Sequence, residues 1–254
     1  MIRLKSRREI EIMKEAAMIL KKAFEKLFPA IRPGVSTAEL DQVAERAIRE
    51  AGGEPAFKGY RGFPCTLCVS VNDEVVHGIP SARKLLEGDL VSLDLGVKYQ
   101  GYYSDAARSR VVGKGTSEAE RLVRVAQEAF SAGIDAVRES GKRIGDLSRA
   151  VQEVVEQNGF GVVRDYVGHG IGQAIHEEPS VPNFGKLGHG PRIEPGLVLA
   201  IEPMLTAGHY AVETLSDGWT VVTKDRRLAS HYEDTVAFTE AGPVNLTGPD
   251  ESWN

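Results

Sequence analysis

The sequence lacks the features that mark a membrane, secreted or nucleic-acid-binding protein. Its 254 residues contain only two cysteines, and no apolar run is long enough for a transmembrane helix. The first residues carry no apolar stretch typical of a signal peptide. The formal net charge of −5 argues against a broad basic surface for nucleic acid. We therefore expect a cytoplasmic protein with no membrane partner and no specific nucleic-acid partner.

The cysteines, Cys65 and Cys68, form a lone CxxC motif. Positions i and i+3 of a strand point to opposite faces, which makes a disulfide or a shared metal awkward. No second CxxC is present to complete a zinc site, so the sequence favours two small, half-buried side chains. The Lys- and Arg-rich start is interleaved with Glu and favours a solvated helix face. The length permits one large domain or two small ones.

The most informative stretch is Val91–Val112. Its alternating apolar residues predict two strands, each with one buried face, joined by a turn near Lys98–Gly101. Asp94 and Asp105 are equidistant from the Tyr99–Gln100 bond, so a turn closing there would place them directly opposite each other. Two carboxylates so placed repel unless a proton or a cation lies between them. The alternative is one solvated Asp and one turn Asp.

Helical periodicity occurs twice along the chain. It predicts helices at Glu9–Leu27 and about Thr37–Ala51, and again at Glu118–Val137 and in a segment ending at Gly159. Gly141–Leu147 repeats the pattern found 107 positions earlier, from residue 34 to residue 40. We expect one domain over residues 1–254, with two similar halves at about 9–113 and 118–240 that share a sheet around an approximate twofold.

The repeat extends to a pair of acidic residues. Gly88–Asp94 matches Gly196–Glu202 at a displacement of 108. Leu197–Met204 is apolar except at Glu202, which predicts a fully buried strand. An ionised carboxylate in such a strand costs several kcal/mol, on the order of 5, unless it is paired or bound to a metal.

A second acidic strand and one histidine complete the candidate site. Ser230–Thr239 is predicted as the last strand and carries Glu233, and the tail after Gly242 is predicted to be irregular. Four carboxylates would bring about −4 to the sheet, which requires at least two divalent cations or several protons. His169, in a predicted glycine-rich loop, offers the nitrogen ligand that suits transition metals. His189, His209 and His231 are assigned structural or solvated roles.

Several motifs together resemble one enzyme family over about Glu9 to Thr239. They are His77-Gly-Ile-Pro80, Asp94, Asp105, Gly168-His169-Gly-Ile-Gly172, His176-Glu177-Glu178-Pro179, Ile201-Glu202-Pro203-Met204 and Tyr232-Glu233. This set is similar to methionine aminopeptidase of the short bacterial kind, type I. The resemblance implies an α+β pita-bread fold, a curved antiparallel sheet with helices on its outer face. It agrees with the internal repeat.

The resemblance also implies a dinuclear metal site and a reaction. Asp94 would bind one divalent ion (Co, Mn, Fe or Zn), Asp105 and Glu233 would bridge two, and His169 and Glu202 would complete the second. A metal-bridged hydroxide would attack the first peptide bond of nascent chains and release their N-terminal methionine. Glu202 would carry the proton from the water to the leaving amine.

Two histidines and an apolar pocket would serve the substrate. His77 would meet the substrate amide, and His176 would donate to the developing oxyanion. The resemblance implies a methionine pocket formed by Tyr60, Phe63, Cys68, His77, Ile175 and Trp219; reading the aromatic members as plain core is the alternative. Val76, Ile175 and Cys65 stand where many members have Cys, Phe and Lys, and Ser109 replaces a usual Thr, which affects the expected pocket shape more than the metal site.

Two rival functions use the same residues. Xaa-Pro aminopeptidases and prolidases share the five ligands but usually carry an extra N-terminal domain, and few residues precede the first predicted helix here. A non-catalytic binding module on this fold would typically have lost ligands, whereas all five are present. The sequence does not name the metal. Nothing in it demands more than a monomer, and it leaves open whether the basic N-terminal helix docks on the ribosome.

Overall fold

A computed structural model describes residues 1–139 and 141–248. Four α-helices account for most of the helical residues in this part of the chain. Their bounds are α1 Arg7–Leu27, α2 Thr37–Glu50, α3 Ser117–Asp135 and α4 Ile144–Gln157. Two short 3₁₀ turns, η1 Phe28–Ala30 and η2 Tyr60–Gly62, supplement them. None of the helices so described is long and apolar enough to span a membrane.

The strands are short except for a central hairpin. The first half of the chain contributes β1 Glu54–Pro55, β2 Leu67–Val71, β3 Glu74–Val76, β4 Leu90–Tyr99 and β5 Tyr102–Val111. The second half contributes β6 Gly161–Val162, β7 Gly168–Gly170, β8 Glu177–Val181, β9 Val198–Ile201, β10 Met204–Thr206, β11 Val212–Thr214, β12 Val221–Thr223, β13 Ala229–His231, β14 Glu233–Thr239 and β15 Gly242–Asn245.

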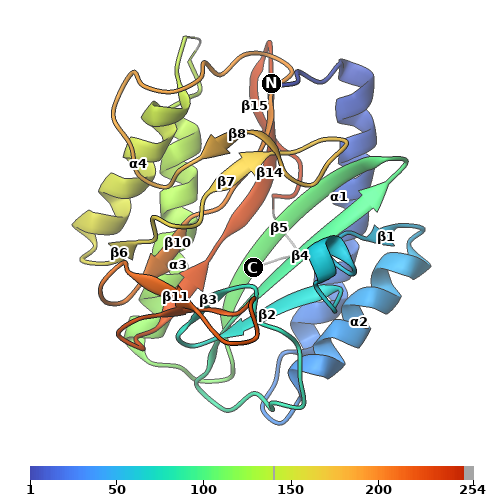
Figure 1. The fold of residues 1–254 in the computed structure, drawn as a ribbon, viewed down its shortest axis with the longest axis vertical. Coiled ribbons are helices and arrows are strands. Elements are labelled where there is room, and N and C mark those ends of the chain that lie inside the picture. The colour runs from blue at the N-terminus through green and yellow to red at the C-terminus, as the bar shows by residue number, and fades with distance from the viewer. Residues whose placement is uncertain (140, 249–254) are drawn as a thin grey trace.

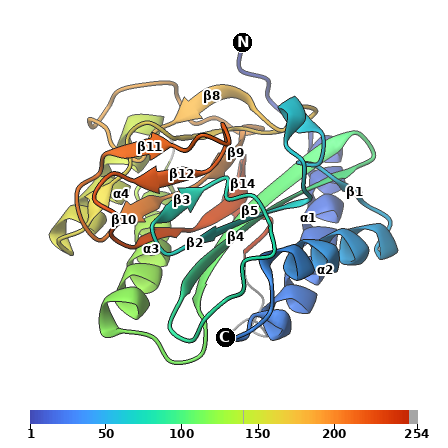
Figure 2. The same ribbon diagram turned by 60° about the horizontal axis from the view of Figure 1, so that its bottom comes forward.

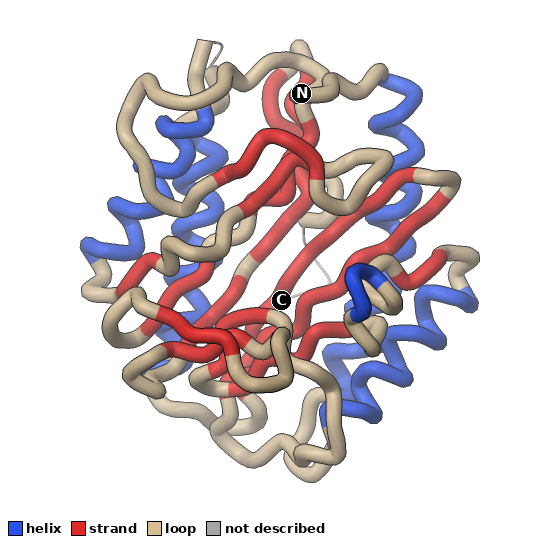
Figure 3. The backbone as a smooth tube through the Cα atoms, viewed as in Figure 1, coloured by secondary structure: helices blue, strands red, loops and turns tan. Residues whose placement is uncertain are grey.

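One sheet joins strands from both halves of the chain. Among the described residues its order is β1-β4-β5-β14-β9-β7-β8, with β2 also paired to β4 and β15 to β14, and every pairing is antiparallel. The helices pack behind this sheet as two pairs, α1 with α2 and α3 with α4 (Figures 1 and 3). The small sheet β11-β12-β3 lies over the opposite face (Figure 2).

The two helix pairs are built alike. Ser36 caps α2, and its backbone N–H donates to Glu39 at 2.8 Å. At the start of α4 the backbone N–H of Arg143 donates to Asp146 at 2.8 Å. Each arrangement satisfies a backbone donor that a helix start leaves open. These helices begin at Thr37 and Ile144, which reproduces the displacement of 107 seen in the sequence.

The central hairpin closes one residue later than the sequence suggested, which moves the partner of each strand residue by two positions. The turn consists of Gln100 and Gly101, with φ of 47° and 82°, and positive φ at both positions defines the tight turn that suits twisted strands. Asp94 therefore pairs with Ala107, and Asp105 pairs with Gly96. The prediction that the two carboxylates lie directly opposite was wrong; they are diagonal neighbours on one face. Both faces of β4 are largely buried rather than one.

Three other expectations were wrong in detail. The strand predicted at 197–204 breaks after Ile201, because Pro203 has no N–H to donate into a ladder. His169 lies on β7 rather than in a loop, and a Cβ on Gly170 would come within 2.2 Å of a neighbouring backbone oxygen, so glycine permits the close pairing. The tail forms β15 against β14 up to Asn245; residues 249–254 lie outside the described part.

Candidate metal and substrate site

The five residues expected to bind metal come from five separate places in the fold. They lie on β4 (Asp94), on β5 (Asp105), on β7 (His169), directly after β9 (Glu202) and at the start of β14 (Glu233). All five line one cavity of about 150 Å³. An apolar cavity of about this volume can hold one benzene molecule, so there is room for a single side chain.

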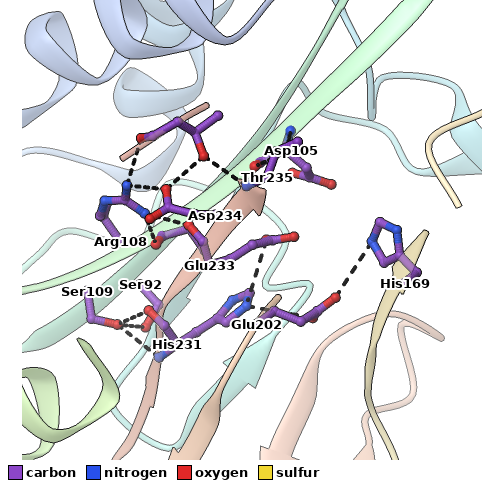
Figure 4. A network of polar contacts seen from close by, with 12 residues as sticks. Ser92, Asp105, Arg108, Ser109, His169, Glu202, His231, Glu233, Asp234 and Thr235 are labelled. Carbon is purple, nitrogen blue, oxygen red and sulfur yellow. Dashed lines mark hydrogen bonds and ion pairs between the residues drawn. The ribbon is translucent and has the colours of Figure 1, made fainter. Parts of the chain in front are cut away.

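The ligand atoms of three of these residues are close enough to share an ion. Potential donor atoms of Asp105, His169 and Glu233 all lie within 4.8 Å of one another. Glu202 joins them, with its Oε1 3.6 Å from Nε2 of His169 (Figure 4). Asp94 is outside this tightest group but lines the same cavity.

Buried oxygens in the cavity lack protein partners. One carboxylate oxygen each of Asp94, Asp105 and Glu233 is buried and accepts no hydrogen bond from any described residue. Burial raises the pKa of Asp94 to about 7. Burial and then the neighbouring carboxylates raise the pKa of Asp105, Glu202 and Glu233 well above the usual range. Carboxylate oxygens that lie this close together without hydrogen-bond partners are suited to bind divalent cations. Such cations would keep the carboxylates ionised.

His169 presents the correct nitrogen to such an ion. Its Nδ1 lies 2.9 Å from the carbonyl oxygen of Gly170, and a carbonyl can only accept, so Nδ1 carries the proton. The lone pair is then on Nε2, which faces Glu202. Burial lowers the pKa of His169 to about 3, so the ring is neutral near pH 7. A backbone carbonyl that fixes the tautomer is common for metal-binding histidines.

A second histidine, to which the sequence assigned a structural or solvated role, lies beside the carboxylates. His231 is 1% exposed, and its Nε2 lies 3.7 Å from Glu202 Oε2 and 3.9 Å from Glu233 Oε2. Glu202 therefore lies between two imidazoles (Figure 4). Neither ring nitrogen of His231 has a hydrogen-bond partner among the described residues. A signal was present, since His231 precedes Glu233 by two, the spacing that puts strand residues on one face.

The two histidines expected to meet the substrate also reach the cavity. His176 Nδ1 lies 2.9 Å from the hydroxyl of Tyr60, and its ring centroid is 4.2 Å from that of His169. His77 follows β3, and its ring lies 6.3 Å from that of Trp219. Burial, followed by the proximity of His176, lowers the pKa of His77 to about 4. Both histidines are therefore neutral hydrogen-bonding groups near pH 7.

The apolar wall of the cavity differs slightly from the predicted pocket. Phe63 and Cys68 line the cavity as expected, and so do Phe57 and Arg61, which were not predicted from the sequence. Ile175 is 2% exposed and packs in the cluster behind Phe57 and Phe63, so it supports the wall from behind. Burial raises the pKa of the Cys68 thiol well above its usual range, which leaves it an uncharged, polarizable lining group.

An ion pair anchors the segment before His176. Lys5 is 4% exposed, and its Nζ lies 2.8 Å from Glu177 Oε2. The other carboxylate oxygen of Glu177 accepts from the backbone N–H groups of Gln173 and Ala174 at 2.8 and 3.1 Å. The start of the chain is therefore not entirely a solvated face as predicted, because Lys5 folds under this turn to pair with Glu177.

Comparisons with known proteins agree on one family. The profile of metallopeptidase family M24 matches residues 11–240. A methionine aminopeptidase from Clostridium perfringens is 51% identical over 247 residues, covering 97% of this chain and 99% of that protein. Methionine aminopeptidase 1 from Bacillus subtilis is 48% identical, with the same coverage.

Solved structures give the same result for the fold. The crystal structure of a methionine aminopeptidase from Thermotoga maritima superposes with a TM-score of 0.95 at 43% identity, covering 98% of this chain and all of that one. The prolidase from Pyrococcus furiosus has a TM-score of 0.77 at 26% identity, and this chain covers 66% of it. The expected α+β pita-bread fold is confirmed. The chain belongs to metallopeptidase family M24, and within it to the methionine aminopeptidases of bacterial type I.

Proposed function

We propose that this chain removes the N-terminal methionine of polypeptides by hydrolysis at a site that holds two divalent metal ions. The observation that carries the proposal is the set of four carboxylates and one neutral imidazole around a single buried cavity. Asp94 would bind one ion, Asp105 and Glu233 would bridge both, and His169 and Glu202 would complete the second. Two divalent ions would balance the roughly −4 charge of the carboxylates.

Metal ions in such a site lower the pKa of a bound water to about 7 and polarise the scissile carbonyl. The protein then has to move one proton and stabilise one developing negative charge. Glu202 is suited to accept the proton of the attacking water and pass it to the leaving amine, because its carboxyl is buried in the cavity beside His169. With metal holding it ionised, the Glu202 carboxylate would accept the proton, and the resulting carboxylic acid would donate it to the leaving amine.

His176 is suited to donate to the developing oxyanion. If the Tyr60 hydroxyl donates to Nδ1 across their 2.9 Å contact, the proton of the neutral ring is on Nε2. His176 lines the cavity, so this N–H would be available as a donor to the oxyanion, a role worth about 3 kcal/mol in comparable sites. His77, also neutral and in the cavity wall, would contact the substrate amide.

Methionine would enter the apolar part of the cavity. Phe63, Trp219 and Cys68 provide aromatic and thiol surface there, with the rings of Phe63 and Trp219 edge to face at 5.1 Å. Such surface suits a flexible thioether. The cavity volume of about 150 Å³ would exclude longer or branched side chains. The substrates would be nascent chains that begin with methionine.

A substrate pair tests the proposal. The protein is stripped of metal and assayed with Met-Ala-Ser and Ala-Pro-Ser, with and without added Mn²⁺ or Co²⁺. We expect metal-dependent release of free Met and no cleavage of the Ala-Pro bond. Cleavage of Ala-Pro instead would assign the site to the proline-directed branch of the family. Failure to cleave either peptide with any metal would support a non-catalytic binding role.

A further inference from the structure

A single arginine stands at the mouth of the cavity. Arg61 is exposed and lines the cavity together with Tyr60 and Phe63. Its guanidinium carbon lies 5.3 Å from the centroid of the Tyr60 ring. Among the described residues that line this cavity, it is the only Lys or Arg. The mouth therefore has a fixed positive charge, whereas the acidic side chains lie deeper, at the buried end.

The backbone holds this arginine in an unusual conformation. Arg61 has a φ of 49° inside the 3₁₀ turn η2, a left-handed conformation that is uncommon for a residue other than Gly, Asn or Asp. The turn is closed by hydrogen bonds from Phe63 N to Tyr60 O at 2.9 Å and from Gly59 N to Phe63 O at 2.8 Å. Strain of this kind concentrates at ligand-contacting positions, so it points to Arg61 as a contact residue.

The turn is also coupled to groups that contact the substrate. Tyr60, which precedes Arg61, is hydrogen-bonded to His176, and Phe63 packs against Trp219. The charge of Arg61 also reaches His176, where it adds to burial in lowering the pKa of the imidazole. An arginine this close to the proposed oxyanion donor is within reach of a substrate held there.

We propose that Arg61 determines specificity by binding a carboxylate on the part of the substrate that lies beyond the scissile bond. This rests on the proposed function, because a chain whose first residue fills the cavity must leave through its mouth. The carboxylate would be an acidic side chain at the third or fourth residue, or the C-terminal carboxylate of a short peptide. Arginine favours carboxylates because its planar fork matches them.

The expected preference is modest because Arg61 is exposed. Exposed ion pairs change an equilibrium by about twofold to fivefold, and added salt screens them. We therefore expect kcat/KM at low salt to be about two to five times higher for the preferred acidic peptide than for the neutral peptide. The preference should decrease as NaCl is raised toward roughly 0.5 M.

The test uses four peptides and the metal-loaded enzyme. Met-Ala-Asp-Ser, Met-Ala-Ser-Asp and Met-Ala-Ser-Ser are used as C-terminal amides, and Met-Ala-Ser-Ser also as the free acid. The variants are Arg61→Gln, the charge-preserving Arg61→Lys, and Arg149→Gln as a control on the exposed side of α4, where Arg149 pairs with Glu153. Release of free Met gives kcat/KM for each combination.

The proposal predicts that Arg61→Gln removes the acidic preference, so that kcat/KM of this variant becomes equal for the acidic and the neutral peptides. Arg61→Lys should keep part of the preference, and Arg149→Gln all of it. Preference for an amidated acidic peptide identifies the side chain, and preference for the free acid alone identifies the C-terminal carboxylate. The proposal is overturned if the unmodified enzyme has equal kcat/KM for all four peptides, or if its preference survives in Arg61→Gln. If even the neutral amide is not cleaved by the unmodified enzyme, the proposed function itself fails.

Discussion

Removing the metal should make the protein less stable as the pH rises above 6.5. In the metal-free fold, burial raises the pKa of Asp94 to about 7 and that of Asp105, Glu202 and Glu233 well above the usual range. In the unfolded chain the same carboxyl groups release their protons at about pH 4. The folded state therefore binds more protons than the unfolded state, and its free energy of unfolding falls as pH rises through the folded pKa values.

Buried histidines contribute with the opposite sign, which sets the pH range for the test. Burial lowers the pKa of His77 to about 4 and of His169 and His231 to about 3. The unfolded chain binds their protons below about pH 6.5 and the folded state does not, so they lower stability as pH falls through that range. Above it they are neutral in both states. Between roughly pH 6.5 and 8, the carboxyl groups therefore determine how the free energy of unfolding changes with pH.

The size of the effect follows from the linkage. Each carboxyl that keeps its proton in the fold across one pH unit lowers the free energy of unfolding by about 1.4 kcal/mol. For a chain of this size that corresponds to a fall in Tm of roughly 3–6 °C per pH unit and per group. Thermal unfolding of the EDTA-treated protein, followed by fluorescence at several pH values, measures it. In metal-loaded protein, where the carboxylates are ionised in the fold, the slope should vanish or reverse.

A variant identifies the groups responsible. Glu233→Gln removes one of the titrating carboxyl groups and one source of repulsion. At about pH 8 the metal-free variant should therefore be more stable than the unmodified chain, and its stability should fall less steeply as pH rises. A Tm of the metal-free, unmodified protein that stays constant or rises over this range would refute the reasoning, because the carboxyl groups would then have to be ionised in the fold without a cation.

Three further variants test individual residues. Glu202→Gln should lower kcat by about a hundredfold or more while the protein still folds, because the amide cannot carry the proton; a near-normal kcat would exclude that role. Asp105→Asn should reduce the bound metal per chain in elemental analysis, and unchanged stoichiometry would count against a bridging Asp105. His231→Leu should weaken Mn²⁺ binding in calorimetric titration by about tenfold, because a group next to Glu202 and Glu233 is lost. His231→Gln is the control that keeps an N–H donor. Equal Mn²⁺ affinities of His231→Leu and the unmodified chain would assign His231 to packing.

Local signals in the sequence predict much of the fold. The helix at α2 starts where Ser36 and Glu39 form their reciprocal cap, and the turn at Gly101 lies within the predicted segment. The register of that hairpin was beyond these signals, because it depends on which two residues adopt positive φ. The tail strand β15 was missed for a similar reason: it is stabilised by pairing with β14, and its own Pro243 and Gly242 indicate a loop.

The site was predictable to the extent that a carboxylate in an apolar strand is conspicuous. Glu202 stood out because its neighbours are apolar, and the repeat linked it to Asp94. His231 did not stand out, because a histidine next to polar residues is common and only the fold brings it beside Glu202. Arg61 also went unnoticed, since neither its position at the cavity mouth nor its φ of 49° leaves a mark in hydrophobic periodicity.

The arrangement of the ligands implies that metal binding and folding are coupled. Asp94 and Asp105 come from the first half of the chain, and His169, Glu202 and Glu233 from the second. The halves meet where β5 pairs with β14, and Glu233 there pairs with Ala107. An ion held by residues from both halves, as proposed, would bind the folded state and would find no matching site in the unfolded chain. At a free metal concentration about a hundredfold above the dissociation constant, such binding adds about 2.7 kcal/mol to the stability. The carboxyl groups that keep their protons in the metal-free fold would thus, once ionised around metal, hold the two halves together.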